Sequence, residues 1–81
     1  MTLAFVLLEC AKGLATSAEQ AVIRVQGVSE THTIKNGSDY DLLVKVHTED
    51  ESQFKTTITN LKGIAGVVAI GVSIVYGGAM Y

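Results

Sequence analysis

Two successive stretches of the chain repeat the same order of hydrophobic patterns, and this repeat constrains the fold more than any other feature. Each stretch begins with a strand-like segment (residues 2–10 and 41–47), continues with an amphipathic helix, reaches a glycine at position 27 or 63, and ends in a second strand. Because the chain has only 81 residues, both halves must share one hydrophobic core. The pattern predicts a single domain over residues 1–81, with its core at 3–76 and a Gly-rich tail at 77–81.

The four predicted strands differ in how they should be buried. Residues 2–10 and 66–76 have apolar side chains at both odd and even positions, which is typical of strands covered on two faces. Residues 28–35 are polar and β-prone, which indicates an edge strand, whereas residues 41–47 alternate as a half-buried strand does. The turn-forming residues at 36–39 predict that the second and third strands form a hairpin.

The helices are predicted from apolar stripes at helical spacing, one over residues 14–25 and one over residues 54–61. Thr16 and Glu19 have the spacing of a capping box, and so have Thr48 and Glu51. We therefore expect the helices to begin near these threonines. Gly27 suits a left-handed C-terminal cap.

The resulting order, βαββαβ, predicts an α+β fold of the ferredoxin-like kind. Right-handed crossovers would place the first and third strands at the centre of the sheet and the second and fourth at its edges. Two helices cover only one face, so about six large apolar side chains of the first and fourth strands would remain open to water. We expect this face to pack on another subunit in an obligate oligomer.

Composition excludes several classes of function. Six basic and eight acidic side chains give a net charge of −2, and the basic ones are dispersed, so direct DNA or RNA binding is not expected. The uncharged run from Gly63 to Tyr81 is long enough to cross a membrane, but its glycines and β-branched residues favour a buried strand and a tail. We expect no secretory signal at the amino terminus, because the apolar run after Met1 has no basic residues before it. The single cysteine, Cys10, excludes an intramolecular disulfide and favours the cytoplasm.

Four segments, AFVLLEC, YDLLVKV, FKTTITNLKGIAGV and VSIVYG, together resemble the effector-binding (RAM) domain of the Lrp/AsnC family over about residues 3–76. The resemblance implies a subunit of the dimeric α+β barrel type, whose sheets pack face to face in dimers that assemble into rings, typically octamers. It implies a small effector of the amino-acid class, and full-length family regulators as partners. Those regulators carry a helix-turn-helix domain ahead of this module. Here only the first strand follows Met1, so we expect a stand-alone sensor.

The same resemblance places effector contacts in the hairpin between the second and third strands. Backbone N–H groups of its turn would hold a carboxylate, Asp41 or Asp39 would accept from an ammonium, and Tyr40 would pack beside the ligand side chain. The family's Gly-x-x-Asp spacing is one residue longer here, and Val72 stands where a Thr is common. An ordinary solvated turn is the alternative. The candidate ligand-binding residues are Gly37, Ser38, Asp39, Tyr40 and Asp41.

Other chemistry has little support in the sequence. His32 and His47, with Glu30 nearby, are better interpreted as exposed strand residues than as metal ligands. Cys10 ends an apolar strand and is interpreted as a packing residue. We expect no catalytic residue, metal or cofactor. Two alternatives stay open: a small dimeric α+β barrel enzyme, which needs polar groups between helices and sheet, and an oligomerisation module without an effector.

Overall fold

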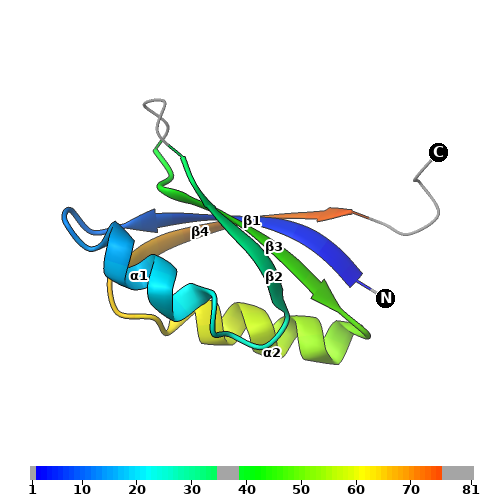
Figure 1. The fold of residues 1–81 in the computed structure, drawn as a ribbon. Coiled ribbons are helices and arrows are strands. Elements are labelled where there is room, and N and C mark those ends of the chain that lie inside the picture. The colour runs from blue at the N-terminus through cyan, green and yellow to red at the C-terminus, as the bar shows by residue number, and fades with distance from the viewer. Residues whose placement is uncertain (1, 35–38, 76–81) are drawn as a thin grey trace.

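A computed structural model of the chain describes residues 2–34 and 39–75. The strands form one antiparallel sheet in the order β2-β3-β1-β4. Both helices lie on the same side of this sheet (Figure 1). The predicted ferredoxin-like βαββαβ fold, with the first and third strands central, is confirmed. The elements are β1 (Thr2–Cys10), α1 (Ala15–Val22), β2 (Val28–Thr33), β3 (Leu42–Thr48), α2 (Glu51–Lys62) and β4 (Val67–Val75).

The core fills the space between the sheet and the two helices. Alternate residues of the two central strands point into it, and the helices supply the opposing side chains. Thr48 and Thr57 are the buried polar residues of the described chain, and each makes a hydrogen bond through its hydroxyl. The apolar core residues are Ala4, Val6, Leu8, Cys10, Ala18, Val22, Leu42, Val44, Val46, Phe54 and Leu61.

The predicted start and end of α1 are both wrong. The N-cap is Leu14, which makes no side-chain capping bond, and the Ser17 hydroxyl donates to the Leu14 carbonyl at 3.1 Å. Glu19 accepts from the Thr33 hydroxyl at 3.0 Å instead of closing a capping box. The helix ends at Val22, so Gly27, at φ +100°, serves the turn into β2 rather than the helix cap.

The predicted capping box of α2 is also displaced. Thr48 is the last residue of β3, and the N-cap is Asp50, whose carboxylate accepts from the Gln53 N–H at 2.8 Å. The Gln53 side chain reaches back to accept from the Glu49 N–H at 3.2 Å. Asp50 and Gln53 thus satisfy two backbone donors at the start of the helix, as a capping box does, two residues later than predicted. The helix ends before Gly63, as predicted.

The strand predicted over residues 66–76 is present as β4, an edge strand paired only with β1 among the described strands. A bulge between Glu9 and Cys10 shifts its register. After the bulge, Ile70 and Val72 pair with Leu8 and Val6, and antiparallel partners share a face of the sheet. These large β4 residues therefore lie on the helix side. No helix among the described residues has the length and apolarity needed to span a membrane.

Candidate functional site

Asp41 fixes the described end of the β2–β3 hairpin to β1. Its N–H donates to the Leu8 carbonyl at 2.8 Å, and its carbonyl accepts from the Ile34 N–H at 2.9 Å. The carboxylate atom Oδ2 accepts from the Cys10 N–H at 2.7 Å. One carboxylate oxygen thus has a structural role, while Oδ1 makes no hydrogen bond within the described residues.

Tyr40 lies across Gly71 of β4. The phenol oxygen is 3.1 Å from the place that a Cβ at position 71 would occupy. Gly71 pairs with Leu7, whose side chain points away from the helices, so Tyr40 covers part of the open face of the sheet. Gly71 was not among the residues singled out from the sequence, although a glycine inside a strand pattern often marks a close approach of this kind.

The predicted ligand-binding residues are only partly described. Asp39 is exposed, and Tyr40 and Asp41 are half-buried. Gly37 and Ser38 lie outside the described residues. Val72 follows Gly71 on β4, but its side chain lies on the opposite face of the sheet from Tyr40.

The sheet face opposite the helices is open and apolar along its centre. Leu3, Phe5 and Leu7 of β1 point to this face, and Leu43 of β3 lies beside Leu7. Phe5 is 38% exposed, and the three leucines are half-buried. These four residues are called the open-face ridge below.

The sequence predicted a larger apolar surface on this face, with a contribution from β4, and the β4 residues that pair with β1 and have described side chains do not supply it. The β4 positions that point to the open face are Ala69, Gly71 and Ser73, because they pair with Glu9, Leu7 and Phe5. The bulge in the pairing with β1 determines which β4 residues point to this face. These three paired positions of β4 therefore line the ridge with small residues.

Charged residues border the ridge on the side of β2. Glu30 lies between two partners, with Oε1 3.2 Å from His32 Nε2 and Oε2 3.4 Å from Lys45 Nζ. The hydrogen bond to His32 and the one to Lys45, together with the Lys45 charge, lower the pKa of the Glu30 carboxyl. All three side chains remain well exposed, so they form a solvated polar margin.

Neither a metal site nor a reactive thiol is built on the described parts of these strands. No group of three His, Cys, Asp or Glu side chains suited to a metal ion occurs in residues 2–34 and 39–75. Cys10 is a core residue, and burial, followed by the nearby Asp41 carboxylate, raises the pKa of its thiol. The interpretation of Cys10 as a packing residue is confirmed.

The sequence matches no known protein-family profile and no curated protein. Solved structures do match. TTHA0845 from Thermus thermophilus superposes with a TM-score of 0.85 at 21% identity, covering 94% of both chains. FFRP-DM1 superposes with a TM-score of 0.84 at 23% identity, covering 94% of this chain and 100% of that one.

Larger transcription regulators contain the same fold over part of their length. AsnC from E. coli superposes with a TM-score of 0.81 at 15% identity, covering 99% of this chain and 54% of that one. The regulator NMB0573 from Neisseria meningitidis, in a complex with L-Met, superposes with a TM-score of 0.80 at 19% identity, covering 99% of this chain and 53% of that one. The chain thus spans about half of each regulator. These matches confirm the resemblance at the level of the fold: the chain has the architecture of a domain found in Lrp/AsnC-type regulators and in small proteins that consist of little else.

Proposed function

We propose that this chain is a ligand-sensing and oligomerisation module that self-associates through the open-face ridge and binds a small effector at the β2–β3 hairpin. The uncovered ridge carries the proposal, because it lies on the one sheet face that the helices leave open. The effector is an amino acid. Support for this class comes from the similar regulator of Neisseria meningitidis, whose structure is a complex with L-Met.

Burial of the ridge is the driving force for assembly. Its four side chains are already partly covered, so each contributes on the order of 1 kcal/mol when a second subunit removes the remaining contact with water. Both subunits contribute equally in a symmetric dimer, which gives roughly 8 kcal/mol before the entropic cost of association. The dimers further assemble into rings, and full-length regulators of the same fold are candidate partners in mixed assemblies.

The hairpin offers groups that suit a zwitterion. Asp41 Oδ1 is available to an ammonium group, and Asp41 is held in place by its bonds to Leu8 and Cys10. Tyr40 presents an aromatic surface next to it. In this proposal the ligand carboxylate is held by backbone N–H groups of Gly37 and Ser38.

The module is proposed to be non-catalytic and cytoplasmic. The space between helices and sheet, where a barrel enzyme would need acids and bases, is filled by the apolar core residues with the hydroxyls of Thr48 and Thr57. A free buried thiol at Cys10 suits a reducing compartment.

Assembly is tested by sedimentation of wild type, Phe5→Lys and a matched control, Ile23→Lys. Ile23 is also an exposed apolar residue, but it follows α1 on the helix side. We expect wild type and Ile23→Lys to sediment as oligomers and Phe5→Lys as a smaller species. A wild-type monomer at about 10 µM contradicts the assembly proposal, because the apolar ridge would then stay in contact with water in the free protein.

Effector binding is tested by thermal shift against the twenty amino acids and by calorimetry on any that stabilise the fold. Asp41→Asn should weaken binding about tenfold, because a charge-assisted hydrogen bond is lost. The asparagine oxygen can still accept from the Cys10 N–H, so assembly should persist. Asp39→Asn tests the other candidate carboxylate. Absence of binding below millimolar concentration, or equal binding by Asp41→Asn and wild type, contradicts the proposed effector site and favours a pure assembly module.

A further inference from the structure

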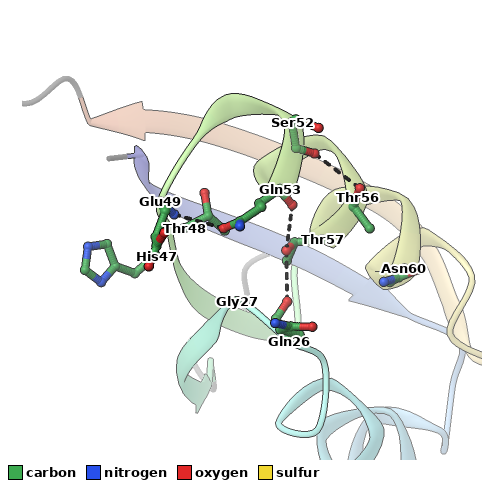
Figure 2. Close-up of a pocket in the computed structure, with 10 residues that line it drawn as sticks. All are labelled: Gln26, Gly27, His47, Thr48, Glu49, Ser52, Gln53, Thr56, Thr57 and Asn60. Atoms are coloured by element: carbon green, nitrogen blue, oxygen red, sulfur yellow. Dashed lines mark hydrogen bonds between the residues drawn. The ribbon is translucent and has the colours of Figure 1, made fainter.

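A polar groove lies at the end of the molecule away from the effector hairpin. It has a volume of about 790 Å³ and runs between α2 and the turn that joins α1 to β2 (Figure 2). His47 and Thr48 at the end of β3, and Glu49 after them, also line it. The hairpin precedes the first residue of β3 and the groove is lined by the last two, so roughly 20 Å of strand separates the two sites. The groove is therefore independent of the proposed effector site.

The two walls of the groove are fixed to each other. Thr57, only 3% exposed, donates from Oγ1 to the Gln26 carbonyl at 2.9 Å and lies 3.0 Å from the Gln53 carbonyl. The His47 N–H donates to the Gly27 carbonyl at 2.8 Å. This close approach needs glycine at position 27, where a Cβ would lie 2.5 Å from Thr57 Oγ1. The cavity is thus formed before any ligand arrives, which reduces the entropic cost of binding.

The wall formed by α2 is a stripe of neutral polar side chains. Ser52, Thr56 and Asn60 recur at four-residue spacing and so share one face of the helix. None of the three residue types is a strong helix former, and a solvated helix face usually carries charge. The charged residues of this helix, Glu51, Lys55 and Lys62, do not line the groove.

Several groups at the groove have hydrogen-bonding capacity to spare. The carboxamides of Gln26 and Asn60 and the hydroxyl of Ser52 line it, and within the described residues these side-chain groups make no hydrogen bond. Each group offers both a donor and an acceptor. A ligand hydroxyl has the same dual character, so it can pair with all three. No Lys or Arg of the described chain lines the groove to attract an anion.

From this geometry we propose that the groove binds a small neutral polyhydroxylated molecule, a sugar or a sugar alcohol. The volume is within the range of pockets for small ligands and is sufficient for a monosaccharide. Among residues 2–34 and 39–75, no Phe, Tyr or Trp lines the groove to stack on a sugar ring, so the expected affinity is in the millimolar range.

The test is an NMR titration of isotope-labelled protein with glucose and with sorbitol. We expect saturable shifts of backbone amides in the groove, around Gly27 and along residues 52–60, with the amides of residues 39–41 unchanged. Gln26→Ala and Asn60→Ala should each weaken binding about threefold or more, because each removes one hydrogen-bonding group. Thr59→Ala is the matched control, since its hydroxyl donates to the Lys55 carbonyl on the same helix and does not line the groove.

Three results would each overturn the proposal. The first is an absence of saturable shifts up to about 100 mM sugar, a concentration at which a millimolar site must fill. The second is equal weakening of binding by Thr59→Ala and Asn60→Ala, and the third is equally strong shifts of the same amides with sodium phosphate or glycine. Retention of amide dispersion in each variant shows that the fold persists. Because the hairpin amides are observed separately, failure of this proposal is distinguishable from failure of the effector site.

Discussion

Substitution of Gly27 by alanine tests how closely the α1–β2 turn is built onto α2. The new Cβ would lie 2.5 Å from Thr57 Oγ1 and 3.1 Å from Thr48 Cγ2, at a backbone φ of +100°. The left-handed conformation alone costs about 1–2 kcal/mol for a residue with a Cβ. Displacement of the Thr57 hydroxyl from its buried bond to Gln26 adds about 1–3 kcal/mol. The expected loss of unfolding free energy is therefore about 2–5 kcal/mol.

Gly13→Ala is the matched control. Gly13 also has a positive φ, +82°, but a Cβ there would have nothing within 4 Å. It should lose only the backbone contribution of about 1–2 kcal/mol. In a Thr57→Ala background the 2.5 Å contact is absent and only the 3.1 Å approach to Thr48 Cγ2 remains. There Gly27→Ala should cost less than in wild type, close to the cost of Gly13→Ala.

Denaturant unfolding at a fixed protein concentration measures these differences, since self-association would otherwise shift the apparent stability. In thermal unfolding the lower bound of about 2 kcal/mol corresponds to a decrease in Tm of at least about 8 °C for a domain of this size. If Gly27→Ala and Gly13→Ala lose the same free energy, or if the Thr57→Ala background leaves the cost of Gly27→Ala unchanged, the contact between Gly27 and Thr57 does not have the role assigned to it.

The shifted pKa values of two side chains are also testable. The raised pKa of Cys10 leaves little thiolate at about pH 8, so its reaction with a disulfide reagent should be slow in the folded protein and fast in denaturant; equal rates would contradict this. The pKa of Glu30 should lie below the ordinary glutamate value in an NMR titration, and Lys45→Gln should raise it. Because the pKa of Glu30 is lowered in the folded protein, the pairing contributes fully to stability above the unfolded-state pKa. That contribution is lost as the pH falls through the lowered, folded-state pKa. An unchanged Glu30 pKa in Lys45→Gln would refute the role of the ion pair.

The fold was predictable because it depends on periodicity, which the sequence displays directly. The helix starts were not, because a capping pattern is local and a strand can extend through it. Thr48 has the right spacing for a cap, but it pairs with Thr2 as the last residue of β3. The chain becomes free to turn only after it, and Asp50 then takes the capping role.

The composition of the open face was predicted less well for a related reason. Alternation along β4 assigns faces only if the pairing with β1 is regular, and the bulge at Glu9 and Cys10 shifts that pairing. The bulge carries no distinctive residue in the sequence. Its effect is to direct Ile70 and Val72 to the helix side and to leave Ala69, Gly71 and Ser73 on the open face.

The candidate site could be predicted only as a location, because its contacts join residues far apart in the chain. Asp41 accepts a hydrogen bond from the Cys10 N–H, which lies 31 positions away in the sequence, and no local sequence pattern predicts such a bond. The contact also connects the two parts of the proposed function. β1 receives Asp41 at its carboxyl end and carries Leu3, Phe5 and Leu7 of the ridge on its open face. An effector bound at Asp41, as proposed, would therefore act on the strand at the centre of the proposed subunit interface. Tyr40, which lies over Gly71, reaches the margin of the same face.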